Sequence, residues 1–417
     1  MNAYVSLLRT PGVARIIAAQ LMARFPSGML SLGFLLHMQH IFGSYGTAGL
    51  VLAAMSIGQA VSGPLTSRWM GQWGMRPVLV LTTSICAVSL IAVALVPLPL
   101  IGYMIAGLVS GLSYPPVQPA VRTIYPKMVN SRQLTPLFSL DASAQEIIWI
   151  AGPVVVTFVA IQIDTVAGIL ISVVFLIGGG LWFLLSPEVG RVRIPRSTRK
   201  LGAVLKRPQV LLATIVGFLL VGACAATETG VVATFGRGNS TAGVVLAIWA
   251  VASLLGGLLL GHIPVGPWSL ARRMVVVLAG SILAAAALMA WTGTPAEFWT
   301  LSGALLVAGL CIAPALAVMF AVVSSSVRFS DTAEAYGWVG KGQLIGAAAG
   351  SAVAGFLIDY VAGTHGGGAG LGGFLVAVAF AAAGTLVPAL FHRRLPDLRG
   401  RDASPLPDTE PVPVQPS

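Results

Sequence analysis

Charged residues are scarce in this chain of 417 residues. Asp, Glu, Lys and Arg make up 9% of the sequence, whereas hydrophobic residues make up 56%. A soluble domain carries about 25% charged residues, and a soluble core of this length could not hide so much apolar surface. The composition therefore excludes an ordinary soluble protein and favours a chain whose solvent is lipid.

The signatures of several other protein classes are also missing. The three cysteines, Cys86, Cys224 and Cys311, lie far apart, and the five histidines form no cluster with them, so we expect neither a metal nor a cofactor. No Gly-x-x-x-x-Gly-Lys-Ser/Thr loop occurs, which argues against an ATP-driven pump. No paired-aspartate metal motif, nucleophile elbow or histidine box occurs, so we do not expect an enzyme.

What the sequence does contain is a series of long apolar runs. One crossing takes roughly 20 apolar residues, and in lipid only helices and closed barrels satisfy the backbone hydrogen bonds. The runs are continuous and do not alternate as barrel strands do. The first run, from Val13, lacks the short core and cleavage site of a signal peptide and is expected to be a span. The expected spans are 13–40, 46–67, 77–97, 99–121, 137–162, 166–186, 209–235, 241–261, 274–293, 297–324, 333–361 and 370–391. The predicted fold is an all-α membrane protein of twelve transmembrane helices.

The two halves of the sequence resemble each other. A shift of 198 residues without gaps aligns the pairs Pro97–Pro295, Pro116–Pro314, Phe138–Tyr336 and Gln145–Gln343. Six helices repeated in parallel predict a twofold axis along the membrane normal, with substrate bound between the halves. We therefore divide the chain into a half at 1–186, a basic central loop at 187–208 and a second half at 209–392. The tail, 393–417, is rich in Pro and Asp and is expected to be disordered.

The basic residues predict the orientation in the membrane. Placing both termini in the cytoplasm puts 21 of the 24 Lys and Arg residues on the cytoplasmic side, where such residues concentrate. The net charge of +11 is then explained by basic loops that face an anionic leaflet, and no nucleic-acid partner is expected. We expect a multi-pass protein of the cell membrane.

The loop after the second span carries a family motif. Arg68, Gly74 and Arg76 lie in a segment that resembles the glycine–aspartate–arginine–glycine–arginine loop of the major facilitator superfamily. Gly71 stands where the Asp of that family is usual. Since that Asp helps to latch the two halves together, the resemblance does not extend to the usual latch.

Further motifs support this resemblance, which covers nearly the whole chain. Gly152 and Pro153, in the fifth span, look like the antiporter signature of the drug and metabolite efflux branch, and Arg122 sits where the family often carries a basic residue. Segments 23–29 and 332–338, together with 141–153, resemble an actinobacterial group of efflux-type members.

The resemblance implies a secondary transporter that works by alternating access. We favour proton-coupled export of small, partly hydrophobic solutes. The alternatives are import of a polar or charged nutrient, and a lipid-precursor flippase. The Gly-x-x-x-Gly pairs at 107–111 and 346–350 are expected to pack helices within each half, so we expect a monomer.

Ionisable residues inside spans are costly and are therefore functional candidates. Asp141 and Glu146 are the candidates for proton coupling, and they lie about 140° apart around their helix. Glu146 lies deeper, roughly 13 Å into the span by helix rise, and we expect it to carry the proton. Asp141 either shares this role or pairs with Arg122 or Arg132 near the cytoplasmic surface.

Other polar and aromatic residues are assigned to two further groups. The candidates for substrate or cavity contact are Arg24, Gln145, Glu228, Lys341, Gln343, Trp149 and Trp338. The candidates for gating or structure are Arg68, Gly74, Arg76, Arg122, Gly152, Pro153 and Glu334. We expect Arg24 to pair with Glu146 or Asp141, and Lys341 with Glu334 or Glu228. The structural alternatives are buried ion pairs for both cations, an interfacial Glu228, a helix-capping Glu334 and tryptophans that only pack.

Overall fold

The computed structural model of the protein describes residues 2–197, 199–236, 240–365 and 370–399, and helices account for most of them. The first part of the chain comprises α1 (Asn2–Arg9), α2 (Val13–Arg24), α3 (Pro26–Phe42), α4 (Tyr45–Trp73), α5 (Met75–Leu95), α6 (Leu100–Leu112), α7 (Val117–Met128), α8 (Ser131–Gln162), α9 (Thr165–Leu185) and α10 (Pro187–Arg191). The second part comprises η1 (Ala203–Lys206), α11 (Pro208–Phe235), α12 (Ser240–Leu260), α13 (Ser269–Trp291), α14 (Ala296–Gly309), α15 (Ile312–Ser326), α16 (Phe329–His365), α17 (Leu371–Leu390) and η2 (His392–Arg394).

Twelve segments of the described chain are arranged as membrane spans. Eleven are long and apolar enough to cross a membrane, with α6 and α7 counted as one and α14 and α15 as another. The remaining span is α2 followed by α3, which only Phe25 separates. The predicted all-α fold is confirmed.

Three of the spans are interrupted, which the sequence prediction of continuous helices did not anticipate. Pro26 begins α3 directly after the break at Phe25, and Pro115 and Pro116 lie in the gap between α6 and α7. Pro314 lies in the first turn of α15. Proline has no N–H to continue a helix ladder and disfavours helical backbone in the residue before it. The other helix-interior prolines, such as Pro64 and Pro153, leave α4 and α8 continuous.

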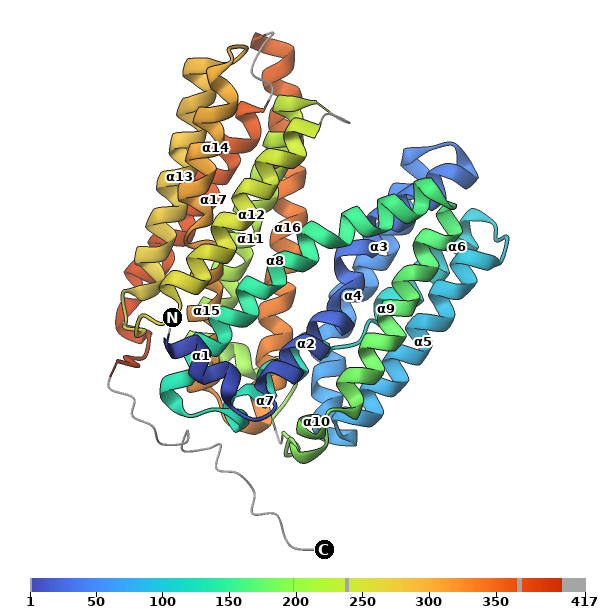
Figure 1. Cartoon of the computed structure of the whole chain (residues 1–417), viewed down its shortest axis with the longest axis vertical. Helices are drawn as coiled ribbons and strands as arrows, with labels where there is room; N and C mark the ends of the chain where they lie inside the picture. The colour runs from blue at the N-terminus through green and yellow to red at the C-terminus, as the bar shows by residue number, and fades with distance from the viewer. Residues whose placement is uncertain (1, 198, 237–239, 366–369, 400–417) are drawn as a thin grey trace, which may run out of the picture.

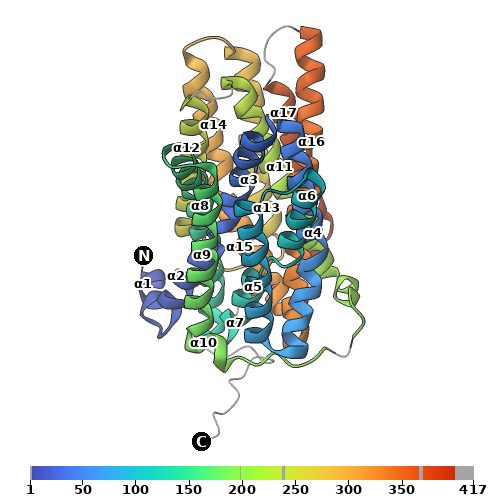
Figure 2. The same cartoon turned by 90° about the vertical axis from the view of Figure 1, so that its right-hand side faces the viewer.

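The spans form two six-helix groups, α2 to α9 and α11 to α17, which we call the first and second halves. Near the end that carries α1, α10 and η2, α8 packs against α12 and α15, while α4 and α7 pack against α16. We call this the basic end. The ribbons of the halves lie together there and diverge toward the opposite end (Figure 1). In the turned view the spans of both halves run close to vertical (Figure 2).

Contacts at the centre of the molecule follow the sequence repeat. Phe138 and Tyr336, which the shift of 198 residues aligns, touch each other with ring centroids 6.2 Å apart. The same shift aligns Arg122 with Phe320, and the guanidinium carbon of Arg122 lies 3.4 Å from the centroid of the Phe320 ring. Aligned residues can meet in this way only at a twofold axis, so these contacts support the predicted parallel arrangement.

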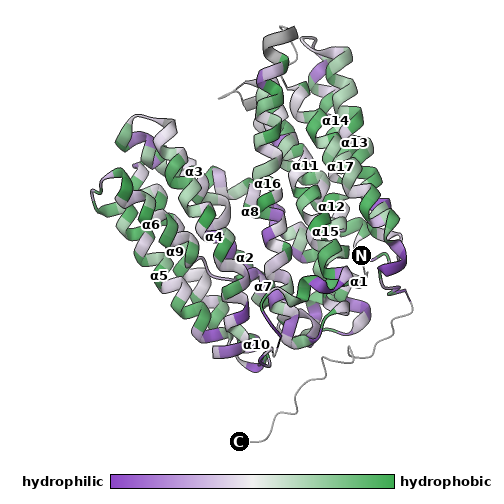
Figure 3. Ribbon diagram, turned by 180° about the vertical axis from the view of Figure 1, so that it is seen from behind, coloured by the Kyte–Doolittle hydropathy of each residue, from purple (hydrophilic) through white to green (hydrophobic). Residues whose placement is uncertain are grey.

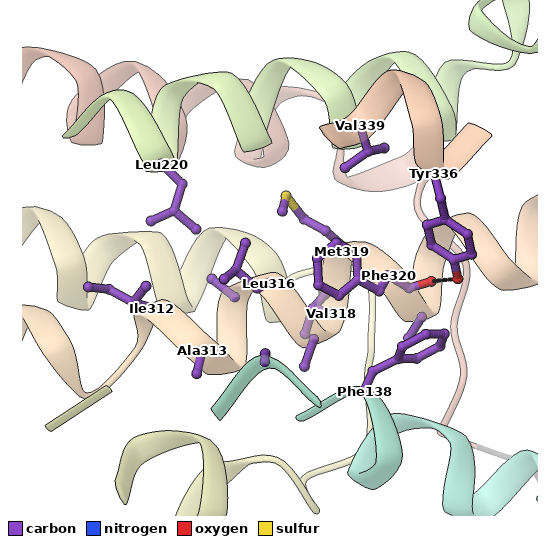
Figure 4. Packing of buried hydrophobic residues seen from close by; sticks show 14 of the residues in the cluster. Phe138, Leu220, Ile312, Ala313, Leu316, Val318, Met319, Phe320, Tyr336 and Val339 are labelled. Atoms are coloured by element: carbon purple, nitrogen blue, oxygen red, sulfur yellow. Dashed lines mark hydrogen bonds between the residues drawn. The ribbon is translucent and has the colours of Figure 1, made fainter. Parts of the chain in front are cut away.

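Helix α15 forms the centre of the hydrophobic core. Residues 312–324 of this helix are all buried, and Phe320 contacts the ring of Phe138 from α8 at a centroid distance of 6.1 Å. Figure 4 shows Leu316 and Met319 among the buried side chains around it, and Tyr336 donating its hydroxyl hydrogen bond to the Phe320 carbonyl, at 2.9 Å. Hydrophobic residues predominate along the spans, whereas hydrophilic ones are frequent at the basic end (Figure 3).

Small residues let several helices approach closely. A Cβ atom added at Gly111 would overlap the Met55 carbonyl of α4, and one at Gly346 would overlap the Phe218 carbonyl of α11. Both contacts lie within one half, as predicted. Gly257 in α12 and Gly261 directly after it have the same spacing and instead receive Ser143 and Ser139 of α8. The sequence analysis did not single out this pair, which joins the two halves.

Candidate functional site

A buried polar network lies where α2, α7 and α8 meet. Its members are Gln20, Arg24, Gln118, Arg122, Tyr125, Asp141 and Gln145, and we call them the arginine–aspartate cluster. Asp141 is 0% exposed and is its centre. Arg122 Nε lies 3.0 Å from Asp141 Oδ2, and Arg24 Nη1 lies 3.3 Å from Oδ1. The Tyr125 hydroxyl and the Gln20 amide also donate to Oδ1, each at 3.1 Å.

Local structure explains how these groups meet. Arg24 ends α2, and Ser27 Oγ donates to its carbonyl at 2.7 Å, which satisfies a backbone group that the helix break leaves free. Asp141 and Gln145 are four residues apart and share one face of α8. Gln145 Oε1 therefore accepts a hydrogen bond from Arg24 Nη2 beside the ion pair.

The charges in this cluster do not balance. Arg24 and Arg122 supply two guanidiniums, of which 8% and 2% of the side-chain surface is exposed, and Asp141 supplies one carboxylate. The excess positive charge is met by neutral acceptors. Gln118, with its amide oxygen turned toward the arginines, accepts from Arg122 Nη1 at 2.7 Å and from Arg24 Nη2 at 3.2 Å.

Two expectations about Asp141 have different outcomes. The ion pair of Arg24 with Asp141, one of the two predicted pairs, is present. The predicted pairing with Arg122, one of two arginines named for it, is also present, but its predicted solvated location is wrong because Asp141 is completely buried. The break between α6 and α7 places Arg122 in the interior, in the second turn of a new helix.

Glu146 lies on a different face of α8 and contacts the other half. Ser253 Oγ of α12 donates to Glu146 Oε1 at 2.8 Å. Glu228 of α11 is close enough for its charge to act on Glu146. Cys224 of α11 is in turn close enough to both glutamates for their charges to act on it. We call Glu146, Glu228 and Ser253 the inter-half carboxylate site. Within the described parts of the chain, neither glutamate forms an ion pair.

The predicted ion pair of Lys341 with Glu334 or Glu228 is wrong. Lys341 forms no ion pair with any carboxylate that the structure describes, and its side chain lies against Gly63 of α4. Glu334 instead contacts Arg68 Nη1 at 3.3 Å and accepts from the Gly202 backbone N–H at 2.7 Å. Two helical turns separate Glu334 from Lys341, about 10 Å along the axis, so a shared helix face does not bring them together.

The contact between Arg68 and Glu334 joins the two halves at the basic end. Arg68 Nη2 also donates to the Arg199 carbonyl, so α4, α16 and the central loop meet at one point. We call Arg68, Glu334 and Gly202 the basic-end lock. Gly71, which stands where the family has its latching Asp, lies beneath the loop, since an added Cβ would lie 3.2 Å from the Pro195 carbonyl. The central loop therefore covers the position of the missing Asp.

The aromatic and amide candidates do not converge on one place. Trp338 lies 3.8 Å from the position of an added Cβ at Gly202, so it packs near the central loop. Trp149 is 52% exposed on α8. Gln343 lies beside Gly217 of α11, and its Nε2 has no partner among the described residues.

The remaining structural candidates shape helix contacts and turns. An added Cβ at Gly152 would lie 2.8 Å from the Gly28 carbonyl carbon, so this glycine lets α3 and α8 touch. Gly74 has φ of +93°, in the left-handed region, and joins α4 to α5. Arg76 lies over Gly190 of α10.

Sequence reasoning missed several members of both sites. Gln20 and Gln118 each lie four residues before a cluster arginine, a spacing that puts them on the same helix face. That signal was available in the sequence. Ser253 gave none, since a single serine in an apolar span usually bonds its own helix. Among the described residues no group of three or more potential ligands could hold a metal ion.

These features define a membrane protein of two six-helix halves that carries ionisable side chains at and beside the contact between them. Residues 16–264 match the family model of the major facilitator superfamily. The chain belongs to that superfamily, and it is a membrane transporter rather than an enzyme.

Solved structures share the fold at low sequence identity. A bacterial homologue of the iron transporter ferroportin, in an outward-facing state, is 13% identical over 92% of this chain and 99% of its own, with a TM-score of 0.69. The human organic anion transporter MFSD10 is 15% identical over 91% and 99%, with a TM-score of 0.67. The proton:xylose symporter XylE is 15% identical over 94% and 98%, with a TM-score of 0.68. No curated protein matches the sequence.

Proposed function

We propose that the protein is a proton-coupled secondary transporter that exports small, partly hydrophobic solutes by alternating access. The observation that carries this proposal is the hydrogen bond between Glu146 of the first half and Ser253 of the second. Alternating access requires the halves to move against each other about a central site. A titratable group that bonds across the halves connects protonation to that movement.

The surroundings of Glu146 support a proton as the coupling ion. Glu228, the side chain of the second half whose charge acts on Glu146, is also acidic. Arg24 and Arg122 of the first half pair with Asp141, on another face of α8. A proton is therefore the cation that neutralises Glu146, and its loss changes the charge at the contact between the halves.

The orientation in the membrane and the direction of transport are supported by different features. The basic end faces the cytoplasm because Lys and Arg concentrate there. The halves meet at this end, so with the proposed orientation the closed side is the cytoplasmic one. The exposed side chains of Ile147 and Trp149, next to Glu146 on α8, favour a partly apolar solute. The resemblance of Gly152 and Pro153 to an antiporter signature favours export.

One observation favours a second candidate, the transport of an anionic nutrient into the cell. The arginine–aspartate cluster carries two guanidiniums against one carboxylate. An anion that displaced Gln145 from Arg24 would balance this charge. The fold shared with a protein described as an organic anion transporter is compatible with this candidate.

Reconstituted protein tests the proposal. Compounds are first screened for those that raise the thermal stability of the purified protein, and each hit is then followed in proteoliposomes with an imposed proton gradient. We expect Glu146→Gln to abolish gradient-driven transport and to keep counterflow exchange of the same compound. The matched control is Glu297→Gln, and this variant should transport normally. Glu297 lies in the first turn of α14, at the end of the molecule opposite the basic end.

The outcomes separate the alternatives. Transport by the Glu146→Gln variant at the wild-type rate under a gradient would refute Glu146 as the carrier and make Asp141 the next candidate. Transport that persists in the wild type after an ionophore collapses the gradient would rule out proton coupling altogether.

A further inference from the structure

A second charged site lies at the basic end, away from the inter-half carboxylate site. A cavity of about 480 Å³ is lined by Pro195, Arg196, Arg199, Arg328, Phe329, Ser330 and Asp331. Three of these side chains are guanidiniums and one is a carboxylate, so the lining has an excess of two positive charges. The cavity lies between the central loop and the first turn of α16.

The carboxylate of this cavity already has partners. Ser197 Oγ donates to Asp331 Oδ1 at 2.6 Å, and Arg199 Nε lies 3.8 Å from Oδ2. Arg196 and Arg328 are exposed, and neither guanidinium forms an ion pair or hydrogen bond with another described residue, while the Arg328 carbonyl accepts from Thr332 Oγ1. Two guanidiniums from separate segments thus line one cavity, and no described carboxylate pairs with either of them.

We propose that this cavity binds a phosphate-bearing anion, through Arg196 and Arg328, and that binding stabilises the closed basic end. Guanidinium groups form strong, paired hydrogen bonds with phosphate oxygens. A phosphate monoester or diphosphate of suitable size balances the two excess charges. The N–H groups at the start of α16 add a favourable field for an anion.

The position of the cavity connects binding to conformation. Arg199, which lines it, also supplies the carbonyl that accepts from Arg68 of the basic-end lock. Glu334 of the lock lies one turn beyond Asp331 on α16. An anion that ties the central loop to α16 therefore holds the loop where Gly202 donates to Glu334. The inference does not depend on proton coupling or on the transported solute.

The binding test uses two sources of the same chemistry. The purified protein in a neutral detergent is titrated with inorganic pyrophosphate, against potassium chloride at equal ionic strength, and its thermal stability is followed. In parallel, the protein is placed in nanodiscs of phosphatidylcholine with and without phosphatidylglycerol. We expect at least one source to stabilise the wild type. The Arg196→Gln/Arg328→Gln double variant should bind that source about tenfold more weakly or worse, since a hydrogen bond to a charged group contributes about 1.5–3 kcal/mol.

A matched pair of variants makes the result specific. Arg191→Gln/Arg193→Gln removes two exposed arginines from the same end but outside the cavity, and it should bind like the wild type. A response to pyrophosphate assigns a soluble ligand, and a response to phosphatidylglycerol alone assigns a lipid headgroup. No response to either, an equal response to chloride, or an equal loss in the control pair would overturn the proposal.

The conformational part has its own readout. Spin labels at exposed positions of the two halves, Arg132→Cys on α8 and Arg272→Cys on α13, report the separation of the halves at the basic end. Saturation with the stabilising anion should increase the short-distance population in the wild-type background and leave it unchanged in the Arg196→Gln/Arg328→Gln background. Binding without any change in the distance distribution would refute the coupling to closure.

Discussion

The charge imbalance around Asp141 leads to a quantitative prediction about stability. Asp141 accepts four hydrogen bonds, and two of the donors are buried guanidiniums. Asp141→Asn removes the only carboxylate of the cluster and leaves Arg24 and Arg122 without a counter-charge. Breaking a buried ion pair by removal of one partner costs about 3–5 kcal/mol. We expect a destabilisation of that size.

Removal of a cation should have a much smaller effect. Arg24→Gln leaves Arg122 and Asp141 as a one-to-one pair. The hydrogen bonds of Arg24 to Asp141, Gln20 and Gln145 are lost, and removal of the excess positive charge offsets part of this loss. We expect a change within about 1.5 kcal/mol. The Arg24→Gln/Asp141→Asn double variant should be more stable than Asp141→Asn alone. The coupling energy between the two substitutions should be about 0.5–3 kcal/mol.

Equilibrium unfolding in mixed detergent micelles, followed by circular dichroism, provides these free energies. Asp164→Asn is the control, since Asp164 is exposed and caps α9, and Asn caps helices as well as Asp does. It should change stability by less than about 0.5 kcal/mol. If Asp141→Asn is no more destabilising than Arg24→Gln, the excess positive charge does not control the stability of the cluster and the reasoning is refuted.

Two further predictions test the packing and the orientation. Gly152→Ala should reduce the yield of folded protein, because its methyl group would lie within 3 Å of the Gly28 backbone. The control is Gly178→Ala on α9, whose methyl group would meet nothing within 4 Å and should be tolerated. Equal yields of the two variants would refute the close approach of Gly152 to Gly28. In a background without native cysteines, a membrane-impermeant thiol reagent added to intact cells should label Thr294→Cys, between α13 and α14, and spare Arg193→Cys at the basic end; the reverse pattern would place the basic end outside.

The fold could be predicted from the sequence because hydrophobic length and the 198-residue repeat are strong signals. The span breaks were harder to predict. Pro153 and Pro26 are both prolines in apolar runs, yet only Pro26 follows a break. What distinguishes them is whether neighbouring helices satisfy the freed backbone groups, and the sequence does not contain that information directly.

The site was predicted in part for a similar reason. A charged residue inside an apolar run is conspicuous because a charge in the membrane costs free energy. This argument identified Arg24, Asp141 and Glu146 as candidates. Their partners depend on which faces of different helices meet. Helical spacing separated Asp141 from Glu146 correctly, but the contact of Glu146 with Ser253 joins residues 107 positions apart. The partner of Lys341 was predicted wrongly because spacing along one helix shows which residues share a face. It does not show whether side chains two turns apart, such as those of Lys341 and Glu334, can touch.

The contact of Arg122 with Phe320 shows an advantage of two halves that are not identical. These positions correspond to each other and face each other on the axis. In a pair of identical six-helix halves, the same residue would meet itself there, either as two repelling guanidiniums or as two phenyl rings. In this chain one half supplies the cation and its aspartate, and the other supplies an aromatic face. The residue of the second half that the 198-residue shift aligns with Asp141 is Val339, which is fully buried. One half has thus become the electrostatic side of this contact and the other its apolar support.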